Sequence, residues 1–172
     1  MAILSTLCYI SKEDHWLMLH RTKKKKDLNS GKWIGIGGKF EEGESPEECL
    51  IREVFEETGL TLERYFFRGI VTFVSDCAPT EYMHLFTADC PEGTLRNCDE
   101  GDLHWIAKEK VPELPTWAGD RVFLELLMRN EPFFSLKLCY QGEKLTRILL
   151  NGQIMPYPLT NCSDTTNIQS KK

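Results

Sequence analysis

The sequence predicts an α+β fold, with a mixed, mostly antiparallel sheet between helices. Three observations lead to it: β-rich segments precede and follow a first helix, a second helix comes after the later strands, and strands and helices do not alternate strictly. A chain of 172 residues suits one domain with a sizeable core. The apolar rhythm ends near Pro156, so we expect a domain over 1–155 and a disordered tail over 156–172.

The chain begins with two apolar, strand-forming runs, 2–10 and 15–20, joined by a polar turn, which predicts a hairpin or its equivalent. The basic run 21–26 then leads into a loop. Solvated lysines are the more common explanation of such a run. The alternative is that one or two of them, Lys24 among them, contact the phosphates of a ligand.

The next segment, 31–40, carries four glycines around Trp33, Ile34 and Ile36. Glycines this dense inside a strand pattern predict close approach of another backbone or of a ligand. Since Gly37 immediately precedes the following turn and helix, its carbonyl could supply an oxygen ligand to a metal there.

A short helix from Pro46 is well marked at both ends. Ser45 and Glu48 form a capping box, Pro46 stands at the first helical position, and Gly59 can take the left-handed conformation just past the last turn. This segment therefore predicts a helix over 46–58.

The faces of this helix differ in chemistry. Glu53, Glu56 and Glu57 fall within one sector, and the apolar face is expected on the opposite side, at Ile51, Val54, Phe55 and Thr58. Carboxylates three and four residues apart repel by roughly 0.2–0.5 kcal/mol per pair, unless a cation neutralises them. Hard oxygen ligands suit Mg²⁺. The alternative is a solvated acidic face.

The second half of the chain predicts further strands and one more helix. Strands are expected at 65–74 and 81–88, paired antiparallel, and at 103–106. A loop with two prolines at 109–115 precedes an amphipathic helix at 117–129, and a hairpin at 133–139 and 144–150 closes the domain.

Composition excludes several classes of function. The net charge of −5 gives no electrostatic case for binding nucleic acid polymers or anionic membranes. The sequence shows neither a signal peptide nor an apolar run of membrane-spanning length, so we expect a cytoplasmic protein. Its seven cysteines are an odd number without metal-binding spacing, which indicates reduced thiols.

One motif joins the helix to the turn before it. Gly38, five residues, Glu44, seven residues and then 52–60, REVFEETGL, resembles the Nudix box, with every fixed position filled. The resemblance implies an α/β/α sandwich and hydrolysis of a phosphoanhydride with Mg²⁺, or with Mn²⁺ as a possible substitute.

The same resemblance implies roles for individual residues. Glu53, Glu56 and Glu57 would hold the metal, with the Gly37 carbonyl nearby. Arg52 would orient Glu53, and Glu44 would pair with Arg52. The box leaves the general base open, and Glu56 or Glu53 is our expectation.

A further acid is expected from the polar segment before the strand at 103–106. Glu100, between Asp99 and Asp102, could complete the metal site or act as the base. An exposed acidic loop is the equally reasonable alternative.

Outside the box, residues 33–39, the Asp99–Glu100 pair and the segment from Pro115 to Asp120 are similar to the 8-oxo-dGTP diphosphatase branch. This implies that a base stacks on Trp117 and that Asp120 reads its edge, with Trp33 and Ile34 nearby. Two positions depart from that branch: Ile34 stands where its mammalian member has a base-reading Asn, and Gly119 replaces the first of two aspartates. Both tryptophans could instead be core aromatics.

Three hypotheses about function follow. The first is hydrolysis of 8-oxo-dGTP or a related oxidised purine nucleotide to the monophosphate and pyrophosphate. The second is a Nudix hydrolase of another nucleoside diphosphate derivative, ADP-ribose or a dinucleoside polyphosphate. The third is a nucleotide-binding module without turnover, against which the intact glutamates argue. The expected partner is a small-molecule nucleotide, and the expected state a monomer or homodimer.

Overall fold

The computed structural model describes residues 1–23 and 28–156. Lys24 and residues 157–172 of the expected tail lie outside this part of the chain. The lysine contact with phosphate and the domain boundary near residue 155 therefore stay predictions. Within the described residues, no helix is long and apolar enough to cross a membrane.

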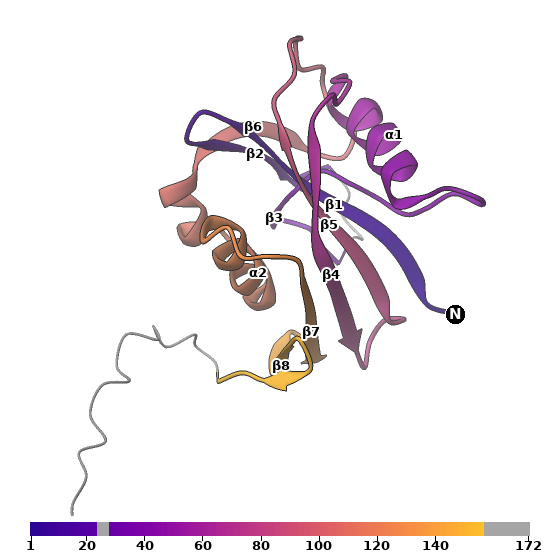
Figure 1. Ribbon diagram of the computed structural model, residues 1–172, viewed down its shortest axis with the longest axis vertical. Coiled ribbons are helices and arrows are strands. Elements are labelled where there is room, and N and C mark those ends of the chain that lie inside the picture. Colours follow the sequence, from indigo (N-terminus) through magenta and orange to yellow (C-terminus); the bar gives the residue numbers. More distant parts are fainter. Residues whose placement is uncertain (24–27, 157–172) are drawn as a thin grey trace, which may run out of the picture.

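Strands in the described residues form one mixed sheet (Figure 1). The strands are β1 (Ile3–Lys12), β2 (His15–His20), β3 (Trp33–Ile34), β4 (Tyr65–Ser75), β5 (Glu81–Asp89), β6 (Asp102–Ala107), β7 (Phe134–Gln141), β8 (Lys144–Leu150) and β9 (Gln153–Ile154). Their order is β3-β2-β1-β5-β4-β7-β8-β9, and β6 pairs with β2. β1 pairs with β5, and β4 with β7, in parallel; the other pairs are antiparallel.

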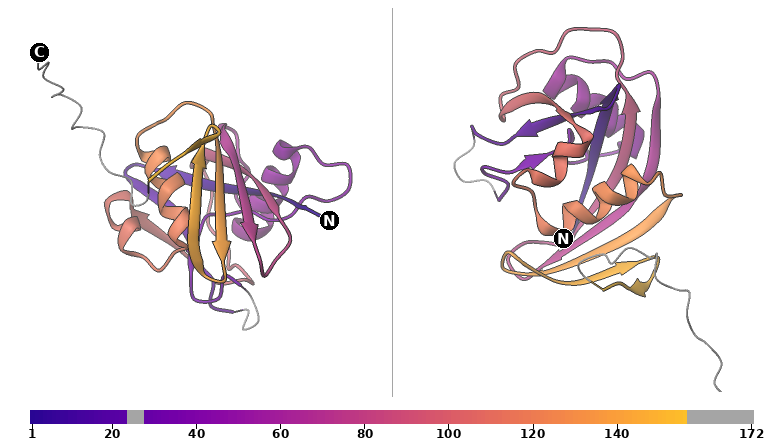
Figure 2. Two further views of the ribbon diagram at one scale, coloured as in Figure 1. Left: turned by 90° about the horizontal axis from the view of Figure 1, so that it is seen from below. Right: turned by 90° about the vertical axis from the view of Figure 1, so that its left-hand side faces the viewer.

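Two α-helices lie on opposite faces of this sheet (Figures 1 and 2). They are α1 (Pro46–Thr58) and α2 (Ala118–Met128). Side chains alternate between the two faces along each strand, so β1 and β2 supply apolar residues to both sides. This arrangement is the predicted α+β sandwich, and the expected strands and helices are present with ends shifted by a few residues.

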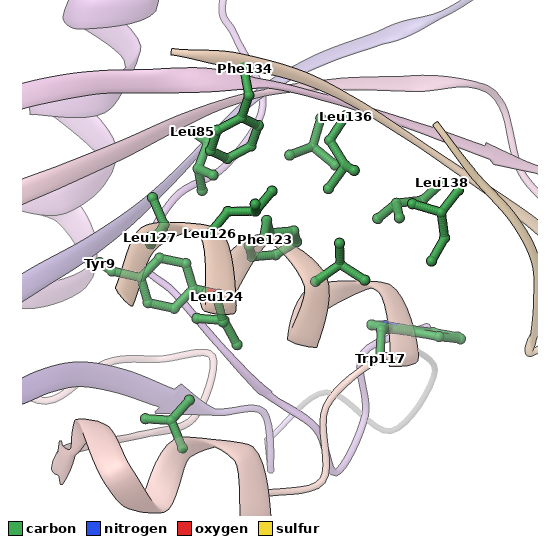
Figure 3. Close-up of a cluster of buried hydrophobic side chains, with 14 of the residues drawn as sticks. Tyr9, Leu85, Trp117, Phe123, Leu124, Leu126, Leu127, Phe134, Leu136 and Leu138 are labelled. Carbon is green, nitrogen blue, oxygen red and sulfur yellow. The ribbon is translucent and has the colours of Figure 1, made fainter. Parts of the chain in front are cut away.

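Each face of the sheet has its own hydrophobic core. On the α2 side, Phe123 of the helix belongs to one cluster with Tyr9 of β1 and Leu85 of β5 (Figure 3). On the α1 side, Ile10, Leu50 and Phe86 are fully buried. Burial of such a side chain contributes roughly 1.5–3 kcal/mol, so both helices are held on the sheet mainly by apolar contacts.

Two details of the second half differ from the sequence predictions. The expected loop at 109–115 contains a 3₁₀ helix, Lys108–Glu113. Its Val111 is fully buried in the core on the α2 side, and Pro112 has the fixed φ that a helical turn accepts. The short strand β9 was not predicted, because two exposed residues paired with β8 give no apolar pattern.

Candidate active site

The helix α1 begins and ends as the sequence predicts. Ser45 Oγ accepts the Glu48 amide at 3.2 Å, and the Glu48 carboxylate accepts the Ser45 amide at 2.8 Å. Gly59 ends the helix in the left-handed conformation, with φ 78°. Such caps stabilise a helix by about 0.5–2 kcal/mol each. The caps fix where the helix begins and ends, and therefore where its glutamates lie.

The predicted faces of α1 are wrong in part. Phe55 is 48% exposed, whereas Glu57 is only 7% exposed. The buried stripe runs through Leu50, Val54 and Glu57, which are spaced i, i+4 and i+7 and so share one side of the helix. The Arg96 guanidinium lies 4.7 Å from the centre of the Phe55 ring and covers it. One acidic side chain is thus turned into the protein instead of toward solvent.

Arg52, in the middle of α1, binds carboxylates of the helix and of the turn before it. Its guanidinium donates two hydrogen bonds to Glu44, at 2.6 and 2.8 Å, and one to Glu53, at 2.7 Å. It also donates to the Lys39 carbonyl at 3.0 Å and, at 3.3 Å, to Glu56, whose side chain is 56% exposed. The hydrogen bonds from Arg52 lower the pKa of Glu44 to about 2. Glu53 is therefore held in place by a cation that is itself anchored.

Glu57 is held from the other side by the glycine segment. The Gly37 amide donates to Glu57 Oε2 at 3.0 Å. Burial, with a smaller contribution from the charges of Glu100 and Glu53, nevertheless raises the pKa of Glu57 to about 8 against the opposing effect of the Gly37 amide. Burial likewise raises the pKa of Glu53. The charge of Glu100 also disfavours ionisation of both Glu53 and Glu57.

The glycine segment follows strand β1 closely, as its composition predicts. Cys8 and Ile36 exchange backbone hydrogen bonds of 2.7 and 2.9 Å, and the Thr6 amide donates to the Gly38 carbonyl at 2.8 Å. A Cβ atom on Gly38 would lie 2.4 Å from the carboxyl carbon of Glu53. Glycine at this position therefore makes room for the Glu53 carboxylate.

Glu100 reaches the same region from the loop before β6. It forms an ion pair with Arg21, at the end of β2, whose side chain is only 11% exposed. Its charge raises the pKa of both Glu53 and Glu57. The structure thus places Glu100 beside the helix glutamates, as the first of the two interpretations of this acidic segment expects.

The chemistry of these donors suits a hard divalent cation. Within residues 1–23 and 28–156, no group of three or more His, Cys, Asp or Glu side chains is arranged so as to hold a metal ion. Glu53 and Glu57 are instead held by Arg52 and the Gly37 amide. Burial is the largest cause of the raised pKa of each, and neighbouring carboxylates add to it; a bound divalent cation would favour their ionised forms. The residues present thus fit such an ion.

A cavity of about 500 Å³ extends from this acidic cluster. Glu53, Glu100, Gly37 and Gly38 line it together with Trp117, Asp120, Ile34, Phe73, Met83 and Glu81. One cavity is therefore lined by two of the clustered carboxylates, Glu53 and Glu100, and by an aromatic and acidic region supplied by β4, β5 and the start of α2.

Trp117 is anchored in the cavity wall. It is 7% exposed, and its Nε1–H donates to Asn29 Oδ1 at 2.8 Å. Phe73 and Tyr140 pack against it in T-shaped arrangements, and the Lys32 ammonium lies 4.3 Å from the centre of its ring. Trp117 belongs both to the core on the α2 side and to the cavity wall. A role as a core aromatic and a role in contact with a ligand therefore do not exclude each other.

Trp33 does not line this cavity. Its ring stacks on His20, with centroids 4.5 Å apart and planes 2° from parallel. The Trp33 amide donates to the Pro115 carbonyl at 2.9 Å, which ties β3 to the segment before Trp117. Trp33 therefore supports the wall, while Ile34 lies in it.

Asp120 directly follows Gly119 and is the one aspartate at these two positions. A side chain on Gly119 would meet Leu138 and the Tyr140 hydroxyl, so α2 packs closely here. Burial raises the pKa of Asp120 to about 7, although the Trp117 backbone and the Lys32 charge act in the opposite direction. The buried Tyr9 is its other titratable neighbour.

Asp120 should make the protein less stable as the pH rises from about 4 to about 7. In this window the folded protein retains a proton that unfolded Asp120, with its ordinary pKa of 3.8, has released, so the free energy of unfolding falls with pH. Asp120→Asn should remove this part of the pH dependence, measured as Tm against pH. Asp89→Asn, at an exposed aspartate on β5, is the control. Parallel curves for wild type and Asp120→Asn would contradict the assignment.

Several residues at the site have no signal in the sequence. Arg21, Asn29, Lys32 and Glu81 each contact or line the cluster or the cavity. Arg21 and Glu100 are far apart in the chain, as are Asn29 and Trp117, so only the fold brings them together.

Comparison with known proteins agrees with this architecture. The protein-family model of the NUDIX domain matches residues 1–127 of the sequence. An oxidized purine nucleoside triphosphate hydrolase from Danio rerio is 36% identical over 112 residues, 64% of this chain and 71% of that protein. A Nudix hydrolase from Bacillus subtilis is 31% identical over 80% of this chain and 87% of its own.

Solved structures give the same result. A mutator MutT protein from Bacillus halodurans superposes with a TM-score of 0.77 at 28% identity, covering 88% of this chain and 99% of that one. A MutT protein from Methanosarcina mazei gives 0.66 at 29% identity, over 75% and 94%. The family match covers most of the described domain, including α1 and its glutamates. The chain belongs to the Nudix family.

Proposed function

We propose that the protein hydrolyses a purine nucleoside triphosphate to the monophosphate and pyrophosphate, with 8-oxo-dGTP or a related oxidised purine nucleotide as substrate. The observation that carries the proposal is the single cavity lined by Glu53 and Glu100 as well as by Trp117 and Asp120. A nucleotide spanning it would place its phosphates near the carboxylates and its base near the aromatic wall.

The carboxylates account for the phosphate chemistry. Glu53, Glu56, Glu57 and Glu100, with the Gly37 carbonyl, would hold Mg²⁺, which when bound supplies positive charge that offsets the phosphate oxygens. Arg52 orients Glu53 through a hydrogen bond of 2.7 Å and opposes the rise in the pKa of Glu53 that burial causes. Glu53 lines the cavity and Glu56 is mostly exposed, so Glu53 is the better placed to accept a proton from the attacking water.

The aromatic wall accounts for binding of the base. Stacking of a base on a tryptophan face contributes about 1–3 kcal/mol, provided that the ring is already fixed. Asn29 and the neighbouring aromatic rings fix Trp117 in this way. Relatives with oxidised purine nucleoside triphosphate hydrolase or 8-oxo-dGTP diphosphatase in their names, at 33–36% identity, support the same substrate class.

A substrate panel tests the proposal. Purified protein with Mg²⁺ should release pyrophosphate from 8-oxo-dGTP with a higher kcat/KM than from dGTP, and chelation of the metal should abolish release. ADP-ribose and dinucleoside polyphosphates in the same panel test the second hypothesis. Equal or slower release from 8-oxo-dGTP than from dGTP would refute the substrate assignment, and no turnover of any nucleotide would favour the binding module.

A further inference from the structure

Glu81 is a carboxylate in the cavity wall, distant from the acidic cluster in sequence. It is the first residue of β5, in register with Phe73 on β4 and Ile3 on β1. Alternation along β5 places it on the same face of the sheet as Leu85, the face that α2 covers. Glu81 lines the cavity together with Phe73 and Met83, and with Trp117 and Asp120 from the start of α2.

One hydrogen bond holds the Glu81 side chain. Ser5 Oγ, on a residue only 4% exposed, donates to Glu81 Oε1 at 2.6 Å. Within the residues that the structure describes, the second oxygen, Oε2, accepts no hydrogen bond and faces no ion-pair partner. Ser5 thus orients the carboxylate, and Oε2 can still accept hydrogen bonds.

The second oxygen of Glu81 is not among the buried side-chain atoms of the described residues that lack a hydrogen-bond partner, so solvent or a ligand in the cavity can reach it. Glu81 is partly shielded from water, and its neighbours in the cavity wall include an aromatic ring and a thioether. An ionised carboxylate accepts hydrogen bonds only, so a ligand that replaces the water near Oε2 has to bring donors of its own. Arg21, which also lines the cavity, is paired with Glu100. A ligand with N–H donors would satisfy Glu81.

We propose that Glu81 is a specificity-determining residue that accepts hydrogen bonds from the N1–H and 2-amino groups of a guanine-type base. This inference rests on the proposed function for the presence of a nucleotide in the cavity. Two adjacent N–H donors match the two oxygens of one carboxylate, as a guanidinium does. Adenine offers an amino donor beside a ring nitrogen that accepts, and that nitrogen would repel the second oxygen.

The inference concerns the base and not its oxidation. The N1–H and 2-amino edge is the same in guanine and 8-oxoguanine, so Glu81 should favour both over adenine counterparts. Ile34, which also lines the cavity, has no side-chain hydrogen-bonding group and so offers the base no such contact.

Substitution by glutamine tests the role. Glu81→Gln keeps the shape but replaces one acceptor oxygen by a donor, so kcat/KM for 8-oxo-dGTP should fall about 10- to 100-fold, mainly through KM. The value for 8-oxo-dATP should change by less than about threefold. Glu63→Gln, the same change at an exposed glutamate before β4, should alter neither. An unchanged ratio of the two kcat/KM values in Glu81→Gln would overturn the inference.

A binding measurement separates this inference from the proposed function. Calorimetric titration with dGMP, 8-oxo-dGMP and dAMP requires no turnover, and the two guanine nucleotides should bind wild type more tightly than dAMP does. Absence of 8-oxo-dGTP hydrolysis refutes the proposed function alone. Equal affinity of wild type and Glu81→Gln for dGMP, or no binding of dGMP by wild type, overturns the role of Glu81.

A second variant covers the case in which Glu81→Gln fails to fold. Glu81→Asp keeps the charge but withdraws the carboxylate from the cavity. It should retain the wild-type Tm within a few degrees and lose affinity for dGMP in the same direction as Glu81→Gln. Wild-type dGMP affinity in a folded Glu81→Asp protein would show that Glu81 only braces β5 against Ser5.

Discussion

Replacement of Glu53 by glutamine should lower kcat for nucleotide hydrolysis by about 10²- to 10⁴-fold, the range expected when a positioned acid or base is lost. Glu53 lines the cavity, is held by Arg52 at 2.7 Å and lies against Gly38. The amide retains this shape but neither holds a divalent cation well nor accepts a proton from water. The measurement is kcat with saturating substrate and Mg²⁺.

The stability of the Glu53→Gln protein should change little. Burial already disfavours the charged form of Glu53, as its raised pKa shows, and Arg52 keeps its two hydrogen bonds to Glu44. Glu42→Gln, the same change at an exposed glutamate in the turn before α1, is the matched control and should leave kcat unaltered. A Glu53→Gln enzyme with wild-type kcat would remove Glu53 from the reaction.

The sequence predicts the helix α1 and its ends correctly, because capping is a local property. Ser45, Glu48 and Gly59 interact with residues within a few positions of themselves. Which side of the helix is buried is not local. The sheet covers the stripe through Leu50 and Glu57, and the pattern of apolar residues favoured the side that carries Phe55. Hydrophobic periodicity assigns the buried side from apolar residues, so it does not predict that an acidic residue such as Glu57 is buried.

The residues of the cavity wall are likewise not predicted by local sequence patterns. Trp117 and Asp120 were found through the resemblance to a family, not through the pattern of residues around them. Asn29, which accepts from Trp117, is 88 positions away, and Ser5, which orients Glu81, is 76 positions away. Each contact depends on the order of strands in the sheet, and no spacing in the chain encodes it.

Gly38→Ala should inactivate the enzyme more than it destabilises it. The new Cβ would lie 2.4 Å from the Glu53 carboxyl carbon and 2.5 Å from both of its oxygens, so the carboxylate has to move. A displacement of about 1 Å in a positioned group can reduce the rate by about 10²-fold. We therefore expect kcat to fall at least about 10²-fold in a folded protein, measured alongside Tm.

Two other glycines separate this effect from general damage. In Gly37→Ala the Cβ would lie 2.1 Å from the Thr6 carbonyl oxygen, which β1 holds in place, so this variant should lose stability as well as activity. Gly142, in the β7–β8 hairpin, has φ 57° and open space around it. Gly142→Ala should cost about 1–2 kcal/mol of stability and leave kcat unchanged. If Gly38→Ala behaves like Gly142→Ala, the position of Glu53 against Gly38 has no part in catalysis.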